Sequence, residues 1–212
     1  MLSVCLLMLP VASFAETKAG QVLSITGRAT ATSPEGDIRQ ISKGSKLYAK
    51  DTINTSFSSY TRLKLDDGSY IMLRPDSRFV IDDFKYSKGE SDRGFFSLLR
   101  GGFRAVTGLI ANKKKYRYRT SVATIGIRGT GFIVRVCDSD CQDVEPPPKN
   151  GIYVEVTEKT IILSNNAGDF PYHKGQFAYI PDNDTPAVTL ASRPDVFVQS
   201  PIPPADPANC PQ

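Results

Sequence analysis

The chain has 212 residues, of which 40% are hydrophobic and 23% are charged, and its formal net charge is +4. This length is sufficient for one sizeable hydrophobic core. The modest positive charge permits contact with acidic surfaces but does not argue for nucleic-acid binding by itself, so we expect no nucleic-acid partner. Tryptophan is absent and His173 is the only histidine, so few side chains are suited to acid–base catalysis near neutral pH.

The first fifteen residues have the pattern of a secretory signal peptide. The apolar run from Leu2 to Ala12 is too short to span a bilayer, and Ser13 and Ala15 place small residues at the −3 and −1 positions of a cleavage site before Glu16. No Lys or Arg precedes the run, which departs from the usual pattern, and a buried N-terminal strand or helix is the alternative. Residues 1–15 are therefore predicted to be a signal peptide, which would place the mature chain in the periplasm or outside the cell.

The sequence after the signal peptide is a succession of short apolar segments separated by turn residues. Turn signals about every eight to twelve residues are typical of all-β sandwiches, barrels and solenoids, and little helix is expected. A β domain is predicted over residues 16–181, and residues 182–212 are predicted to be a proline-rich C-terminal tail. The expected strands and hairpins are 21–32, 38–41, 62–74, 78–84, 95–99, 103–106, 116–136, 152–156, 161–163 and, as the last strand, 177–180.

Two glycine-containing turns predict β-hairpins. In the first, Asp67 and Gly68 supply the turn, and a two-residue loop would pair Leu65 with Tyr70 unless a bulge shifts the register. The position of Asp67 in this turn also accounts for the adjacent carboxylates of residues 66 and 67 without a catalytic role. The second is Gly101-Gly102, which separates the segments 95–99 and 103–106.

The segment from Tyr116 to Val136 reads as two strands that meet at a glycine corner. Alternation of residue types with a period of two is the pattern of half-buried strands, and it occurs on both sides of the corner. Closely spaced glycines indicate a positive φ or a close approach of another part of the chain. The corner consists of Gly126, Arg128, Gly129, Thr130 and Gly131.

The glycine corner does not have the features of a phosphate-binding loop. The string GIRGTG lacks the Gly-Lys-Ser/Thr ending of a Walker loop, and the string GTGFIV has Val134 where the third glycine of GxGxxG would stand. A strand rather than a helix is expected after the corner, so no helix N-terminus is available for an anion. A tight corner or bulge within a sheet is the favoured interpretation, and we expect no cofactor.

The same string carries a resemblance to a known family. GIRGTGFIV, preceded by Thr-Ser-Val-Ala-Thr, is similar to the hallmark of the FecR domain family. The similarity extends backward through LLRGGFRAVTG, LKLDDGSYIMLRPDS and GSKLYAKDTINTS, and forward through GIYVEV and KGQFAYIP, so it covers about residues 20–181 and is strongest over 20–136. The resemblance implies a twisted, solenoid-like or sandwich-like β domain with a role in envelope sensing.

In the sensing scheme of that family, the state of an outer-membrane receptor is relayed to a cytoplasmic sigma factor. The scheme uses a cytoplasmic anti-sigma region and a transmembrane helix, neither of which has a counterpart in this sequence. The resemblance therefore implies a stand-alone exported FecR domain.

Three cysteines remain after removal of the signal peptide. Cys137 and Cys141 lie in the string CDSDC, where a disulfide can close a small turn in an oxidising compartment. A metal site that includes the two aspartates is the alternative, but a structural zinc needs four donors and no second Cys or His pair is visible. The disulfide is the favoured interpretation, with no metal, and Cys210 in the tail would stay free or pair between chains.

Basic residues provide the predicted binding site. If Tyr116 and Tyr118 face the core, the arginines that alternate with them face outward together. Such a stripe attracts carboxylates, phosphates or an acidic protein surface, although a solvated strand face with edge lysines is the alternative. The predicted stripe consists of Lys113, Lys114, Lys115, Arg117 and Arg119.

No catalytic constellation is recognisable, because His173 lies alone in a turn before a strand. We therefore expect a non-catalytic module that binds an envelope protein or an anionic polymer. A structural or scaffold component of the cell envelope, or a polysaccharide-binding protein, is the alternative.

Overall fold

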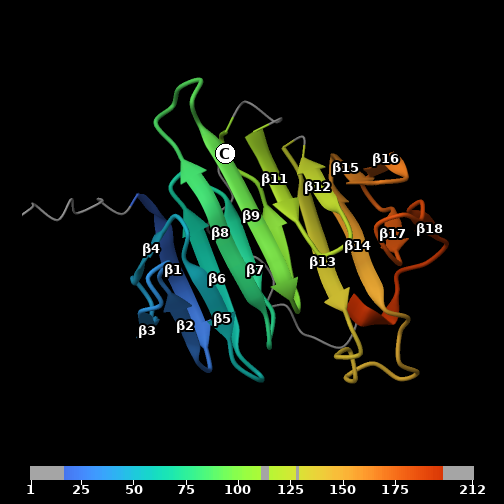
Figure 1. The fold of residues 1–212 in the computed structure, drawn as a ribbon, viewed down its shortest axis with the longest axis horizontal. Helices are drawn as coiled ribbons and strands as arrows, with labels where there is room; N and C mark the ends of the chain where they lie inside the picture. Colours follow the sequence, from blue (N-terminus) through green and yellow to red (C-terminus); the bar gives the residue numbers. More distant parts are fainter. Residues whose placement is uncertain (1–16, 111–114, 128, 198–212) are drawn as a thin grey trace, which may run out of the picture.

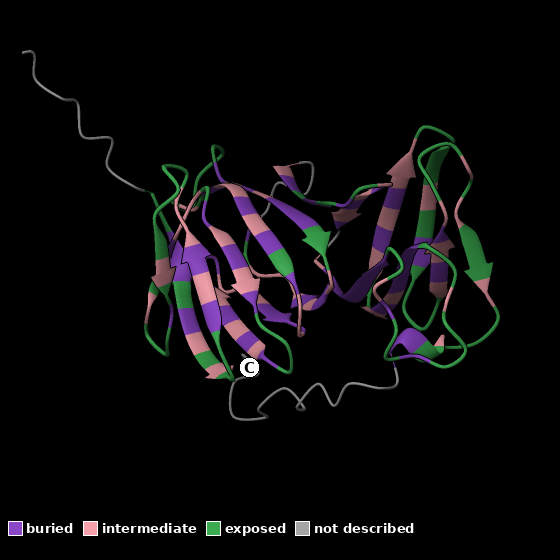
Figure 2. Ribbon diagram, turned by 60° about the horizontal axis from the view of Figure 1, so that its bottom comes forward, coloured by how far each residue is buried: buried purple, intermediate pink, exposed green. Residues whose placement is uncertain are grey.

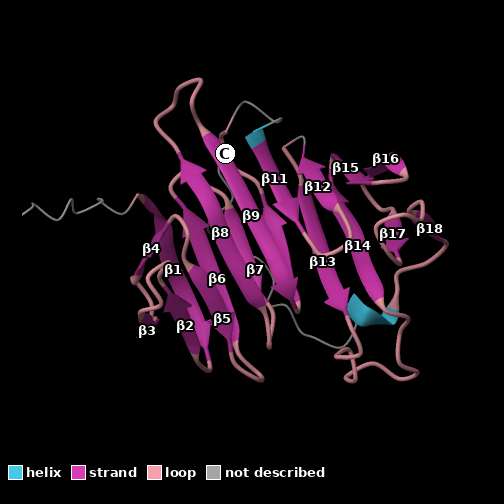
Figure 3. Ribbon diagram, viewed as in Figure 1, coloured by secondary structure: helices cyan, strands magenta, loops and turns pink. Residues whose placement is uncertain are grey.

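The computed structural model of the chain describes residues 17–110, 115–127 and 129–197. Almost all regular structure in these ranges is β-strand (Figures 1 and 3), and a short 3₁₀ turn, η2 (Asp195–Phe197), lies near their end. The strands are β1 (Lys18–Thr26), β2 (Ala29–Thr32), β3 (Ile38–Gln40), β4 (Lys46–Tyr48), β5 (Thr52–Thr55), β6 (Tyr60–Leu65), β7 (Tyr70–Leu73), β8 (Arg78–Lys85), β9 (Arg93–Arg100), β10 (Gly102–Val106), β11 (Tyr116–Arg119), β12 (Thr124–Ile127), β13 (Gly131–Cys137), β14 (Gly151–Glu158), β15 (Thr160–Asn165), β16 (Gly168–His173), β17 (Phe177–Ile180) and β18 (Val188–Leu190).

These strands form two nine-stranded sheets. Sheet A has the order β18-β17-β14-β13-β10-β7-β6-β1-β4, and sheet B has the order β16-β15-β12-β11-β9-β8-β5-β2-β3. The chain passes from one sheet to the other after every one or two strands and so advances along both sheets together, as a solenoid does. The pairing of β9 with β11 is parallel, and the other pairings are antiparallel. The predicted all-β fold with little helix is confirmed, as two facing sheets that do not close into a barrel.

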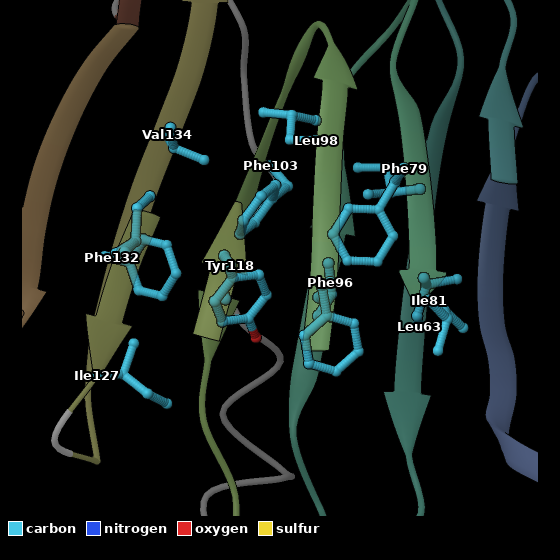
Figure 4. Packing of buried hydrophobic residues seen from close by; sticks show 14 of the residues in the cluster. Leu63, Phe79, Ile81, Phe96, Leu98, Phe103, Tyr118, Ile127, Phe132 and Val134 are labelled. Carbon is cyan, nitrogen blue, oxygen red and sulfur yellow. The ribbon is translucent and has the colours of Figure 1, made fainter. Parts of the chain in front are cut away.

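The main core fills the space between the sheets and is centred on aromatic side chains (Figure 4). The ring of Tyr118 on β11 lies 4.9 Å from that of Phe96 on β9, centroid to centroid, and 5.1 Å from both Phe103 on β10 and Phe132 on β13. All four side chains are buried. Because β9 and β11 belong to sheet B while β10 and β13 belong to sheet A, this cluster joins the two layers.

A second, smaller core lies on the outer face of sheet A. It contains both cysteines of the CDSDC string and the apolar residues of η2, which is coloured as buried in Figure 2. The folded part of the chain thus extends past the predicted boundary at Pro181, because β18 pairs with β17 and η2 packs on β13 and β14. The second core consists of Ile133, Cys137, Cys141, Val144, Tyr153, Val196 and Phe197.

The first predicted hairpin exists, but its register differs from that of a two-residue loop. Leu63 pairs with Ile71, and the amide of Leu65 donates to the carbonyl of Ser69. Gly68 has a φ of 84°, so the loop holds one additional residue in a left-handed conformation and shifts the pairing by one position. As a result, the side chains of Leu63, Ile71 and the neighbouring Leu73 all reach the core.

The second predicted hairpin, at Gly101-Gly102, is wrong. β9 lies in sheet B and β10 lies in sheet A, so the two strands do not pair and the glycines carry the chain from one sheet to the other. Gly101 has a φ of 78°, and a Cβ at Gly102 would lie 2.7 Å from the carbonyl oxygen of Val134. The crossing therefore requires both a left-handed residue and a close approach of backbones.

The segment from Tyr116 to Val136 contains three strands rather than the two that were predicted. β11 and β12 form an antiparallel pair in sheet B, and the chain then crosses to sheet A, where β13 begins. The corner predicted within one sheet is thus a connection between the two sheets. β13 is buried along its whole length because the core covers one face and the second core and neighbouring residues cover the other.

Candidate functional site

The predicted basic stripe lies on the outer face of sheet B. Tyr116 and Tyr118 are buried while Arg117 and Arg119 are exposed, as the alternation predicted. The guanidinium carbon of Arg117 lies 5.1 Å from the centre of the Phe95 ring, and Arg119 has no ion pair among the residues that the structure describes.

Of the three lysines that precede the arginines, Lys115 lies within the described residues. Lys115 donates from Nζ to the carbonyl oxygen of Glu90 at 2.8 Å, which ties it to the loop after β8. Lys113 and Lys114 lie outside the described residues, as does Arg128. We refer to Lys115, Arg117 and Arg119 as the β11 stripe.

The three glycines of the corner have different structural roles. Gly129 has a φ of 68°, and a Cβ at Gly131 would lie 2.6 Å from Oγ1 of Thr157. Gly126 requires neither condition, because the closest atom to a Cβ there would be 3.7 Å away. Gly129 and Gly131 therefore fit the expectation of a positive φ or a close approach, and Gly126 does not.

Thr130 connects the corner to two other parts of the fold. Its amide donates to Oγ1 of Thr107 at 2.7 Å, after β10, and its hydroxyl donates to the carbonyl oxygen of Thr160 at 2.8 Å, at the start of β15. Thr130 is buried, and both of these hydrogen bonds are made to other parts of the protein. The corner therefore has a structural role, which is to fasten the connection between the sheets.

The turn residue Asp67 is buried and belongs to a hydrogen-bonded cluster. Its carboxylate accepts from the amide of Ser69 at 3.0 Å and from the Ser69 hydroxyl at 2.8 Å. The Ser69 hydroxyl also lies 2.7 Å from that of Tyr116 and accepts from the amide of Gly108 at 2.8 Å. Burial raises the pKa of Asp67, and the bonds from Ser69 oppose this shift. Every polar atom of the cluster faces protein, so Asp67 anchors the turn.

A second basic surface, which the sequence analysis did not identify, lies on the outer face of sheet A. Arg62 on β6 pairs with Met72 on β7, and Met72 pairs with Arg104 on β10. Their chain neighbours Leu63 and Phe103 point into the core, so these three side chains lie on the opposite face. Arg74 and Arg135 lie one row further along the same face. We call Arg62, Arg74, Arg104 and Arg135 the sheet A arginine face.

Arg62 and Arg104 are the accessible members of this face. Both are partly exposed, and neither side chain has a hydrogen bond or ion pair within the described part of the chain. Met72 is buried and lies between them on the neighbouring strand, so one guanidinium group stands on each side of an apolar residue. In the sequence, the alternation of Arg62 and Lys64 with leucines indicated that these two side chains face outward. The presence of Arg104 on the same face depends on the order of strands in sheet A, which the sequence does not show.

The described residues contain no group of three or more His, Cys, Asp and Glu side chains that could hold a metal ion. Cys137 and Cys141 are joined in a disulfide, with their Cα atoms 5.3 Å apart. His173 is exposed and contacts the hydroxyl of Thr160 at 3.0 Å. Within the same residues no helix has the length and hydropathy of a membrane-spanning segment.

Comparison with models of protein families shows to which family the chain belongs. The family model for FecR protein matches residues 51–164, more than half of the sequence. The chain belongs to the FecR family. The match runs from the start of β5 into β15, so this FecR domain contains both the β11 stripe and the sheet A arginine face. No curated protein matches the sequence.

Solved structures show a fold similar to that of this chain. Two crystal structures of a candidate anti-sigma factor from Parabacteroides distasonis ATCC 8503, at 2.50 and 1.65 Å resolution, have a TM-score of 0.50 with this chain. The identities are 13% and 12%, and each match covers 66% of this chain and 58% of the crystallised chain. At this level of identity the similarity establishes the fold, and the FecR chain corresponds to little more than half of that protein.

Proposed function

We propose that this FecR domain is a non-catalytic, exported binding module that recognises an acidic surface of a partner protein in envelope signalling. The family assignment supports a place in envelope sensing. The fold shared with a candidate anti-sigma factor supports a regulatory rather than an enzymatic role.

The observation that carries the proposal is the pair Arg62 and Arg104. Two partly exposed guanidinium groups without an ion pair among the described residues are available to a partner. Guanidinium groups form bidentate, charge-assisted hydrogen bonds with carboxylates, and desolvation of the apolar surface around Met72 would add to the affinity.

The β11 stripe is the weaker of the two basic surfaces for this role. Arg117 is already engaged over the ring of Phe95, and Lys115 is bound to a backbone carbonyl. If the partner binds to sheet A, reversal of two charges on the sheet A arginine face should weaken partner binding, and the same reversal on the β11 stripe should not.

The test is affinity capture from envelope extracts with the mature chain as bait, followed by binding measurements with the captured protein after purification. One variant carries Arg62→Glu and Arg104→Glu, and the matched control carries Arg117→Glu and Arg119→Glu, which changes the net charge equally. We expect the first variant to lose the partner and the second to retain it, and the affinity of the native pair to fall as salt is raised.

Capture that survives Arg62→Glu with Arg104→Glu would contradict this assignment of the binding surface. Retention of only an anionic polysaccharide would favour the polymer-binding alternative. A reproducible hydrolytic activity of the purified chain would contradict a non-catalytic role.

A further inference from the structure

Gly126, within β12, has no structural need for the absence of a side chain. It pairs with Arg117 on β11 and with Ile162 on β15, and neither pairing has a bulge. It is not among the glycines with a positive φ, and a Cβ there would lie 3.7 Å from the closest atom. A glycine within a strand otherwise marks a place where another group approaches the backbone closely. No part of the described chain makes such an approach, so the backbone of Gly126 is open to a ligand.

Gly126 belongs to a row of small or apolar residues on the outer face of sheet B. Ile125 and Ile127 are buried, so Gly126 between them faces outward. The row continues to the half-buried Ile162 on β15 and to the exposed Pro171 on the edge strand β16. We call Gly126, Ile162 and Pro171 the apolar row.

Arg117 lies beside this row on β11 but leaves it uncovered. Its guanidinium carbon lies 5.1 Å from the centre of the Phe95 ring. Phe95 is on β9, which is on the other side of β11 from Gly126. The side chain of Arg117 therefore extends away from the apolar row.

A row of polar side chains runs beside the apolar row, with one residue on each of β11, β12, β15 and β16 (Figure 1). Arg119 pairs with Thr124, which pairs with Ser164. Ser164 in turn pairs with Asp169 on the edge strand. None of these four side chains has a hydrogen bond or ion pair within the described part of the chain. We call the four residues the polar row.

The strands around Arg119 are poor in carboxylates. β9, β11, β12 and β15 contain no Asp or Glu. On β8, the next strand, Asp83 forms an ion pair with Arg93, and Asp82 accepts from the hydroxyl of Ser97 at 2.6 Å. Arg119 is therefore available to a carboxylate of a ligand, with which it can form two charge-assisted hydrogen bonds.

The two ends of the polar row have opposite charge. Arg119 and Asp169 are three strands apart, which corresponds to about 14 Å at the usual spacing of strands in a sheet. The hydroxyl groups of Thr124 and Ser164 lie between them, and each can donate and accept. A matching ligand therefore has a carboxylate at one end, hydroxyl groups along the rest of its length and an apolar surface for the neighbouring row.

We propose that these two rows bind an acidic polysaccharide, in which sugar rings combine a carboxylate, several hydroxyl groups and an apolar face of C–H bonds. The carboxylate binds Arg119, the hydroxyl groups bond along the rest of the polar row, and the ring faces pack on the apolar row, where Gly126 permits close contact. This ligand is additional to the protein partner of the proposed function, because the two rows lie on sheet B and the sheet A arginine face lies on the opposite side of the domain.

An acidic peptide fits these rows less well than a polysaccharide does. β12 is paired on both sides, so it has no free edge to which a peptide could add as a strand. A peptide with carboxylates along its whole length would also place negative charge against Asp169. The two classes of ligand can therefore be distinguished by direct comparison.

The test is calorimetric titration of the mature chain with oligogalacturonate, and with neutral dextran oligosaccharide and polyglutamate in parallel. We expect oligogalacturonate to bind and the other two to bind at least about tenfold more weakly. Arg119→Gln should raise the dissociation constant for oligogalacturonate at least about tenfold, because the carboxylate loses its partner. Arg28→Gln is the matched control, because Arg28 is exposed in the turn between β1 and β2, far from both rows in the strand order, and it should leave the constant unchanged.

A second variant tests the apolar row. Gly126→Val places a side chain on the open backbone and should also raise the dissociation constant at least about tenfold. Valine is favoured in strands, and its Cβ would meet no atom closer than 3.7 Å, so we expect this variant to keep the native unfolding temperature.

No binding of oligogalacturonate to the native chain, or an unchanged constant with Arg119→Gln or with folded Gly126→Val, would overturn the proposal. Equal affinity for polyglutamate would assign the rows to an acidic peptide instead. The two proposals fail separately: loss of oligogalacturonate binding leaves protein capture through Arg62 and Arg104 intact, and loss of that capture leaves oligogalacturonate binding measurable.

Discussion

The hydroxyl groups of Ser69 and Tyr116 lie 2.7 Å apart although the residues are 47 positions apart in the chain. This contact joins the turn between β6 and β7, in sheet A, to the first residue of β11, in sheet B. The buried Asp67 completes the cluster from the other side of Ser69. The basic surfaces on the two outer faces are therefore held in a fixed relation by buried polar contacts as well as by the aromatic core.

Removal of the Tyr116 hydroxyl tests this contact. We expect Tyr116→Phe to lower the free energy of unfolding by about 0.5–1.5 kcal/mol, because a buried hydrogen bond is lost. Tyr118→Phe is the control, since the Tyr118 hydroxyl is equally buried and has no hydrogen-bond partner among the described residues. Urea denaturation of both variants measures the difference, and equal losses would contradict a specific role of the Ser69 contact.

The pH dependence of stability tests Asp67. Burial raises its pKa above the ordinary value of 3.8, so the folded chain holds the proton more tightly than the unfolded chain. Stability contributed by this group is fully present below the ordinary pKa and is lost as pH rises through the raised one. The unfolding free energy of native chain minus that of Asp67→Asn should therefore be larger at about pH 3 than at pH 7. A difference that is constant over this range would contradict the raised pKa.

Much of the fold could be predicted because its local pattern is strong. The alternation of Tyr116 to Arg119 places two side chains in the core and two in solvent, as the structure shows. The pair Gly101-Gly102 has the same local signal whether the flanking strands pair or separate into two sheets, so sequence alone could not distinguish these outcomes. Only the separation of these strands into two sheets is compatible with the aromatic cluster that joins the sheets.

The sheet A arginine face could not be predicted for a related reason. Its members come from β6, from the residue after β7, and from β10 and β13, and only the order of strands in sheet A brings them together. Arg135 lies within a strand of apolar residues, where a charged residue gives no indication of its neighbours. The β11 stripe was predictable because its residues follow one another in the sequence.

Two glycines of the corner provide a test of the structural interpretation of the FecR hallmark. Gly131→Ala should lower the unfolding free energy by about 1–3 kcal/mol, because its Cβ would lie 2.6 Å from Oγ1 of the β-branched Thr157. Gly126→Ala should have almost no effect, since its Cβ would meet no atom closer than 3.7 Å. Thermal unfolding of the two variants compares them directly, and a larger loss with Gly126→Ala would show that the corner is held in another way.

The disulfide tests how much the second core contributes to stability. Cys137 and Cys141 are separated by four positions, and a loop this short restricts the unfolded chain modestly, so replacement of both by Ala should cost about 2 kcal/mol or less. Reductant should lower the stability of the native chain by the same amount and have no effect on the double variant. Urea denaturation with and without reductant measures this, and a double variant as stable as the native chain would show that the disulfide adds nothing to the stability of the second core.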